Sequence, residues 1–141
     1  MKRRTLLQGA GASALLAGLL GRDGVAQSGG SAVFELRVYH ASEGKMDALL
    51  ARFRDHTMAL FARHGITSVA YWVPVDDGPL KGHTLYYMLK YPSREEAKVR
   101  WKAFQDDPEW VKVKAASEAN GKLTVTTEST FLELTDFGPR V

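Results

Sequence analysis

The sequence predicts an α+β fold of the ferredoxin-like type, with the element order β-α-β-β-α-β. Three observations predict it. Four segments alternate apolar and polar residues, as half-buried strands do. Two longer segments carry apolar residues at helical spacing. Their order along the chain is that of a split βαβ unit, in which four strands form one antiparallel sheet and the helices cover one of its faces.

The first strand and the first helix carry the clearest patterns. In the strand at residues 33–40, Phe34, Leu36 and Val38 share one face, which we expect to contact the helices. The opposite face is Glu35, Arg37 and Tyr39. The helix begins at residues 42–44 and ends at His64, before Gly65, which favours a left-handed stop. Its apolar stripe has a period of 3.6 and consists of Met46, Leu49, Leu50, Phe53, Leu60 and Phe61.

The remaining elements follow from alternation and from capping signals. We expect strands at residues 66–73, 83–91 and 123–134, with an irregular tail at 135–139. Ser93 and Glu96 have the spacing of a capping box, which predicts a helix start. Asp107 followed by Pro108 restarts a helix, so the second helix is predicted to be broken in two. Trp101, Phe104 and Trp110 lie at core spacing on these helices.

Residues 1–26 have the three-part pattern of a twin-arginine signal peptide. Arg3 and Arg4 precede an uncharged stretch at residues 9–21, and small residues end at Ala26. The apolar stretch is shorter than the roughly 20 residues of a membrane span. We therefore predict export to the periplasm or the medium, with no integral membrane association after cleavage. An ordinary secretion signal or an uncleaved anchor is the alternative. A flexible lead-in at residues 27–32 and one domain at residues 33–138 follow.

Composition excludes several function classes. Removing residues 1–26 takes away four of nineteen basic residues and one of sixteen acidic residues, which leaves fifteen of each. With no basic excess, we predict no nucleic-acid partner. The chain has no cysteine, which excludes disulfides, thiolate catalysis, zinc–thiolate sites and iron–sulfur clusters. The four histidines are scattered along the chain and no two are three or four residues apart, so no metal site and no cofactor is predicted.

Several segments in order resemble the NIPSNAP family. They are residues 34–39, 53–57, 91–97, 107–110 and 128–132. The resemblance covers about residues 33–138 and implies a dimeric α/β barrel, in which two four-stranded sheets face each other across a closed interior. Related barrel families include cofactor-independent monooxygenases, haem-degrading enzymes and small-molecule-binding proteins. The resemblance therefore implies a fold and a homodimer, but it does not fix a chemistry.

The candidate site is the polar face of the first strand. Inside such a barrel, charged side chains are costly to bury unless they are paired or bind a ligand. Because the fourth strand pairs with the first, we expect Glu128 to balance Arg37. The ligand-binding candidates are Glu35, Arg37, Tyr39, Trp72, Tyr87 and Glu128. A structural ion-pair network at the dimer seam is the alternative interpretation.

The predicted function is that of an exported NIPSNAP-domain protein, which binds a small organic molecule between the two sheets of a homodimer. Whether it is an enzyme stays open. One alternative is a non-catalytic interaction or structural module, and a more remote one is a haem-binding or monooxygenase-like enzyme. A ligand-sized void lined by converging polar groups favours binding, whereas a filled interior favours the module.

Overall fold

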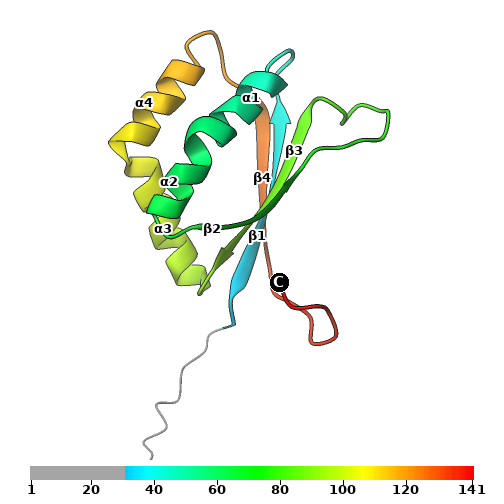
Figure 1. Ribbon diagram of the computed structural model, residues 1–141, viewed down its shortest axis with the longest axis vertical. Helices are drawn as coiled ribbons and strands as arrows, with labels where there is room; N and C mark the ends of the chain where they lie inside the picture. The colour runs from blue at the N-terminus through cyan, green and yellow to red at the C-terminus, as the bar shows by residue number, and fades with distance from the viewer. Residues whose placement is uncertain (1–30) are drawn as a thin grey trace, which may run out of the picture.

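The structure is a computed structural model that describes residues 31–141. The predicted signal peptide and most of the lead-in lie outside the described residues. The elements in order are β1 (Val33–Ala41), α1 (Met46–Arg52), the π-helix η1 (Phe53–Thr57), α2 (Met58–Arg63), β2 (Thr67–Trp72), β3 (Thr84–Tyr91), α3 (Arg94–Asp106), α4 (Pro108–Ser117) and β4 (Thr124–Leu132) (Figure 1). This arrangement confirms the predicted α+β ferredoxin-like fold.

The four strands form one antiparallel sheet in the order β2-β3-β1-β4. The first strand is therefore central, and it pairs with β3 on one side and, as predicted, with β4 on the other. The helices of residues 31–141 all pack on one face of the sheet, and no element of this part of the chain covers the other face (Figure 1). The register places Arg37 between Tyr87 of β3 and Ser129 of β4.

The polar face of β1 faces the helices, which corrects the expectation from its alternation. The ring of Tyr39 packs edge-on against Phe53, with centroids 5.8 Å apart. The guanidinium of Arg37 lies 4.0 Å from the ring centroid of Trp101 on α3. Leu36 therefore lies on the open face. Alternation separates two faces without deciding which one is covered, and buried charges are tolerated here because they are paired.

Large aromatic and aliphatic side chains fill the space between the sheet and the helices. Tyr87 lies at the centre, where its ring approaches Phe53 to 5.0 Å and Tyr71 to 5.5 Å between centroids. Phe61 of α2 meets Phe104 of α3 at 4.8 Å. Offset and edge-on contacts of this kind stabilise a core beyond the apolar area that they bury. They also fix the helix layer over the sheet.

The first helix is one continuous rod with a π-turn in its middle. The backbone N–H of Met58 donates to the carbonyl of Phe53, five residues earlier. The hydroxyl of Thr57 donates to the carbonyl of Arg52 at 3.2 Å. Such π-turns insert one extra residue into a helix and are frequent at functional sites. No helix among residues 31–141 combines the length and the apolar character needed to cross a membrane.

The predicted starts of the later helices are confirmed. The Ser93 side chain accepts a hydrogen bond from the N–H of Glu96 at 3.1 Å. The Asp107 carboxylate accepts one from the N–H of Glu109 at 2.8 Å, and Pro108 occupies the first helical position. These caps satisfy backbone donors that a helix N-terminus leaves free. The break between α3 and α4 sets the direction of α4 over the cavity described next.

Candidate functional site

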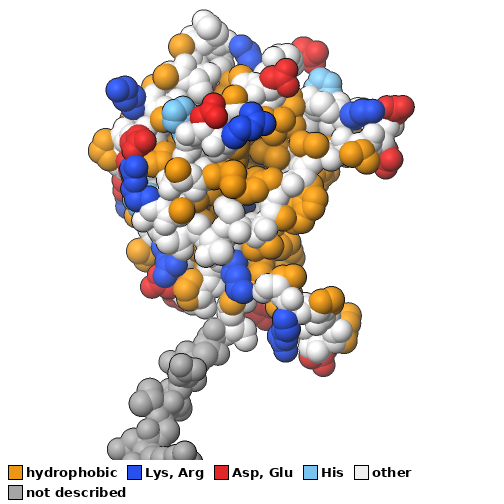
Figure 2. All heavy atoms as spheres, in the orientation of Figure 1, with side chains coloured by type: hydrophobic (Ala, Val, Ile, Leu, Met, Phe, Trp, Pro, Cys, Tyr) orange, Lys and Arg blue, Asp and Glu red, His pale blue; other side chains and the backbone are white. Residues whose placement is uncertain are grey.

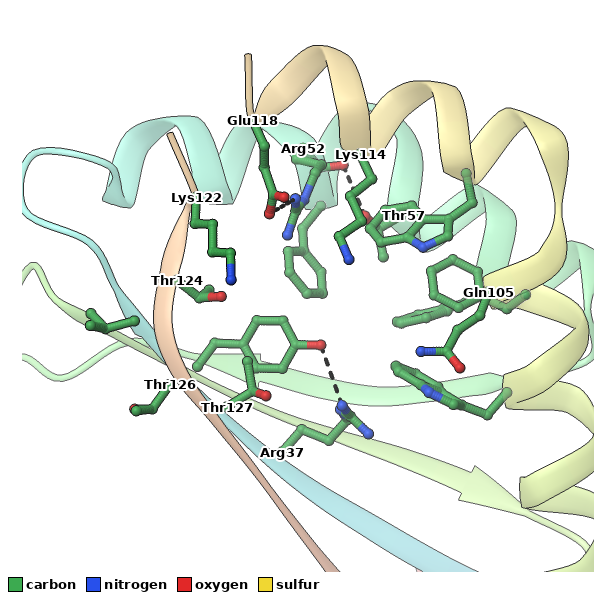
Figure 3. Close-up of a pocket in the computed structure, with 17 residues that line it drawn as sticks. Arg37, Arg52, Thr57, Gln105, Lys114, Glu118, Lys122, Thr124, Thr126 and Thr127 are labelled. Carbon is green, nitrogen blue, oxygen red and sulfur yellow. Dashed lines mark hydrogen bonds and ion pairs between the residues drawn. The ribbon is translucent and has the colours of Figure 1, made fainter. Parts of the chain in front are cut away.

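A cavity of about 340 Å³ lies between the sheet and the helices of this one chain (Figure 3). Its floor is β1, one wall is the beginning of β4, and its roof consists of the first helix, α3 and α4. Both residues that bound the π-turn, Phe53 and Thr57, belong to the lining. The two buried residues of η1 therefore face the same space.

Glu35 and Arg37 form a buried ion pair next to this cavity. Arg37 Nη1 lies 2.5 Å from Glu35 Oε1, and the side chains are 12% and 4% exposed. The hydroxyl of Ser129 donates to the same carboxylate oxygen at 2.6 Å, and that of Tyr91 donates to the other at 3.1 Å. Arg37, Ser129 and Tyr91 thus all donate to the buried carboxylate of Glu35 and offset the cost of burying its charge. The carboxylate in turn holds the Arg37 guanidinium at the cavity floor.

Arg37 keeps donor capacity for a further partner. Its Nη2 donates to the Tyr39 hydroxyl at a long 3.5 Å, and its Nε has no hydrogen-bond partner among residues 31–141. Burial opposes the charged form, but Tyr87, Tyr39 and Glu35 outweigh it and raise the pKa of Arg37 above its ordinary value. The cavity floor therefore presents a permanent cation that is not fully hydrogen-bonded.

A second arginine is buried in the roof. Arg52 is 6% exposed, although the sequence pattern places it off the apolar stripe. Its Nη1 donates to Ser117 at 3.2 Å and to Glu118 Oε1 at 3.3 Å. The guanidinium lies 5.2 Å from the ring centroid of Trp110. Arg52 lies three residues after Leu49, next to the apolar stripe, and its partners from the end of α4 allow its charge to be buried there.

Three further polar side chains point into the cavity. Lys114 of α4, Lys122 of the segment before β4 and Gln105 of α3 extend toward its centre in Figure 3. Neither lysine forms an ion pair with any residue in the described part of the chain. The lining thus holds the cations of Arg37, Arg52, Lys114 and Lys122 and the single carboxylate of Glu118. The cavity is electropositive and has an aromatic surround.

The six residues predicted as ligand-binding candidates divide into two groups. Glu35, Arg37, Tyr39 and Tyr87 lie together on the helical face. Tyr87 is fully buried, burial raises its pKa well above the ordinary value, and its hydroxyl has no partner among the described residues. Of these four, Arg37 and Tyr39 line the cavity directly.

Glu128 and Trp72 lie on the open face instead. The β1–β4 register sets Ser129, not Glu128, opposite Arg37, so the predicted pairing of Glu128 with Arg37 is wrong. Glu128 Oε1 instead lies 2.8 Å from His40 Nε2. Trp72 pairs with Tyr86 at the edge of the sheet and is 48% exposed.

Sequence reasoning missed most of the polar lining. Lys114 and Glu118 have the spacing of an i,i+4 helix pair, which hides the fact that Glu118 binds Arg52 instead. Four successive residues of β4, 124–127, belong to the lining, and threonines among them were the one available signal. Trp101 and Trp110 do pack against Phe104, as predicted for core residues, but they also line the cavity.

The histidines lie away from this cavity. His64 Nε2 lies 2.7 Å from Asp107 Oδ2, where α2 meets the junction of α3 and α4, and His40 contacts Glu128 on the open face. No histidine belongs to the lining. Residues 31–141 contain no group of three side chains that could hold a metal ion.

Comparisons with known proteins agree with this architecture. The family model NIPSNAP matches residues 34–139. A NIPSNAP domain protein from Burkholderia xenovorans superposes with a TM-score of 0.64 at 19% identity, over 77% of this chain and 99% of that one. A NIPSNAP family protein from Agrobacterium tumefaciens gives 0.65 at 24% identity, over 77% and 97%.

A more distant fold likeness is to a monooxygenase of Streptomyces coelicolor in complex with nanaomycin D. Its TM-score is 0.55 at 12% identity, over 79% of this chain and 94% of that one. The cofactor-independent oxygenase SnoaB of Streptomyces nogalater gives 0.52 at 14% identity, over 78% and 99%. Among functionally curated proteins there is no match to this chain.

Proposed function

This chain belongs to the NIPSNAP family, and we propose that it binds a small organic molecule in the cavity between its own sheet and its helices. One observation carries the proposal: a cavity of about 340 Å³ encloses a buried guanidinium that has spare donors. Ligand pockets measure roughly 300–1,000 Å³ and combine apolar walls with a few polar groups. The site proposed here is not the interior between two sheets, because Arg37 lies on the helical face.

The lining suits an organic ligand better than an inorganic ion. Aromatic walls remove water from a bound molecule and leave orientation to the few polar groups among them. Arg37 can offer two N–H groups to one oxygen-bearing group, and a planar guanidinium does this with fixed geometry. Glu35 and Trp101 hold that guanidinium from below and from the side, so little side-chain freedom is lost on binding.

The test is to fill the cavity and look for loss of ligand. Thr127 of β4 points into the cavity, so Thr127→Trp should occupy it (Figure 3). Val99 of α3 is 64% exposed and lines none of the described pockets, so Val99→Trp is the matched control. Native mass spectrometry of protein purified from its own cells should show a bound small molecule in the wild type and in Val99→Trp.

The same molecule should be absent from Thr127→Trp, which must still be folded by circular dichroism. A compound library screened by thermal shift gives a second readout on the same three proteins. A wild type that carries no ligand and that no compound stabilises would show that the cavity is not a binding site. Equal retention in Thr127→Trp would place the ligand elsewhere.

A second candidate function is oxygenation of the bound molecule without a cofactor. The observation that favours it is the pairing of Arg37 and Tyr39 at the floor of an aromatic cavity. Cationic and hydroxyl donors stabilise a developing phenolate or enolate oxygen. Oxygen uptake measured with the retained compound tests this function. No uptake above that of the Thr127→Trp protein would leave binding as the function.

Export remains a proposal that rests on residues 1–26 alone. The Arg3-Arg4 pair supports the twin-arginine pathway, in which lysine does not replace the planar arginine fork. We expect Arg3→Lys with Arg4→Lys to hold the protein in the cytoplasmic fraction, although the charge is unchanged. Normal delivery of this double variant to the periplasm would contradict the pathway.

A further inference from the structure

The cations around the cavity are not equivalent. Glu35 neutralises Arg37, and Glu118 neutralises Arg52. Lys114 and Lys122 have no such partner within residues 31–141, although both amines extend toward the cavity (Figure 3). Both lysines are exposed to solvent, but they line the same cavity, so an anion bound there would meet two positive charges.

Local structure explains why neither lysine is neutralised. The acid in the i+4 position from Lys114 is Glu118, whose carboxylate instead accepts from Arg52. Lys122 follows Gly121, whose positive φ of 106° turns the chain from α4 into β4. The next residue, Leu123, is 1% exposed and anchors this turn in the core. The fold therefore brings the two amines to the cavity from different elements, and the one carboxylate of the lining is already paired with Arg52.

The apolar part of the lining is aromatic and nearly continuous. Phe104 and Trp110 approach each other to 4.6 Å between centroids, and Phe104 and Trp101 to 5.3 Å. Trp101 stacks on Arg37 and Trp110 lies near Arg52. Faces of this kind pack best against a flat conjugated ring system, through offset or edge-on contacts.

We propose that the ligand is a planar aromatic anion, with its rings against Trp101, Phe104 and Trp110 and its charged group bound by Lys114 and Lys122. This inference rests on the function proposed above and narrows its substrate class. A carboxylate between two ammonium groups receives charge-assisted hydrogen bonds, which are the strong kind. The cavity would select against cationic and aliphatic molecules, since the former meet like charges and the latter lose ring contacts.

Isothermal titration calorimetry with three probes tests the proposal. The probes are 2-naphthoate (planar and anionic), 2-naphthamide (planar and neutral) and octanoate (anionic and aliphatic). We expect naphthoate to bind at least about tenfold more tightly than naphthamide, because one charge-assisted hydrogen bond is worth about one order of magnitude in affinity. We expect it also to bind more tightly than octanoate, because octanoate carries the same charge but lacks the ring contacts. Added salt should weaken the binding of naphthoate and leave that of naphthamide unchanged.

Two double variants assign the preference to the lysines. Lys114→Met with Lys122→Met should remove the advantage of naphthoate over naphthamide, whereas Lys114→Arg with Lys122→Arg should keep it. Lys112→Met is the matched control. Lys112 is also on α4, but it lines a different groove, between α4 and the first helix, and not the cavity. Lys114 and Lys122 are both exposed, so we expect the variants to fold, and melting curves check this.

The outcomes separate this inference from the proposed function. Equal binding of naphthoate and naphthamide to the wild type would overturn the anion preference and leave the cavity as a binding site. Octanoate binding as tightly as naphthoate would overturn the aromatic class. If none of the three probes binds, the proposed ligand class is also wrong. Native mass spectrometry of the wild type and of Thr127→Trp decides independently whether the cavity binds any small molecule.

Discussion

At the scale of residues, the centre of the molecule is an ion pair that serves both the fold and the cavity. Glu35 and Arg37 sit two positions apart on a central strand, yet both point into the helix-covered side of the sheet. Tyr91 and Ser129 complete the hydrogen bonding of Glu35 from the two neighbouring strands. Arg37 is therefore a structural ion-pair partner and a lining residue at once, which joins the two interpretations that the sequence left open.

Replacing Arg37 should cost stability as well as ligand binding. Arg37→Met leaves the Glu35 carboxylate buried without its cation, and we expect a loss of about 3–5 kcal/mol in the free energy of unfolding. Urea unfolding measures this loss. Combining Arg37→Met with Glu35→Gln removes the unpaired buried carboxylate charge. The double variant should therefore be more stable than the sum of the two single changes predicts. Strict additivity of the two substitutions would show that the pair is not energetically coupled.

At the scale of elements, one residue joins three helices. Asp107 ends α3 and caps α4, and its carboxylate also contacts the last turn of α2 through His64 at 2.7 Å and Arg63 at 3.3 Å. These contacts hold the roof of the cavity together. The hydrogen bond with His64, followed by that from the N–H of Glu109, lowers the pKa of Asp107 below its ordinary value.

This junction should give the roof a specific sensitivity to acid. Because the folded-state pKa of Asp107 is lowered, its stabilisation is present above the unfolded value of 3.8 and disappears as the pH falls through the folded value. Asp107→Asn keeps the cap but removes the titrating charge. Melting temperatures measured from neutral pH to below 3.8 should therefore fall less steeply in this variant than in the wild type. Identical slopes would show that other carboxylates govern acid unfolding.

At the scale of the whole molecule, no element of the described part of the chain covers the open face of the sheet. Leu36 and Met88 lie opposite each other on it. The loop between β2 and β3 and the C-terminal tail project beyond the sheet (Figure 1), and both carry exposed apolar side chains, such as Val75 and Phe137. Figure 2 shows hydrophobic side chains gathered on this side of the molecule and on both projections. Apolar patches of this kind mark interfaces in soluble proteins.

We propose that two copies pair through this face, as the family resemblance implies, because two-fold pairing of identical surfaces is the simplest way to cover it. Light scattering of the purified domain should give twice the chain mass. Val38→Glu buries a charge in the proposed interface and should yield monomers. Val99→Glu, on the outer side of α3, is the control that should stay dimeric. A monomeric wild type at micromolar concentration would rule out the pairing.

The sequence by itself determined the strands and helices and their order along the chain, with ends that differ from those of the structure by a few residues. These properties are local: alternation identifies a strand, a period of 3.6 identifies a helix, and the signals at Ser93 and Asp107 depend on neighbours within three residues. The fold class follows, because few topologies accommodate this order. Four of the six predicted site residues also proved to lie together, since Glu35, Arg37 and Tyr39 share one strand face and Tyr87 is paired across from it.

Only the tertiary structure decided which face of β1 is covered, and therefore where the site lies. Alternation is symmetric between the two faces. Which face is covered depends on contacts with distant segments of the chain. Trp101 packs against the Arg37 guanidinium, and the Ser129 hydroxyl donates a hydrogen bond to Glu35. The β4 register that excludes Glu128 is set by pairing over almost ninety residues of chain. The burial of Arg52 likewise depends on Ser117 and Glu118, which accept its hydrogen bonds from a distant segment of the chain.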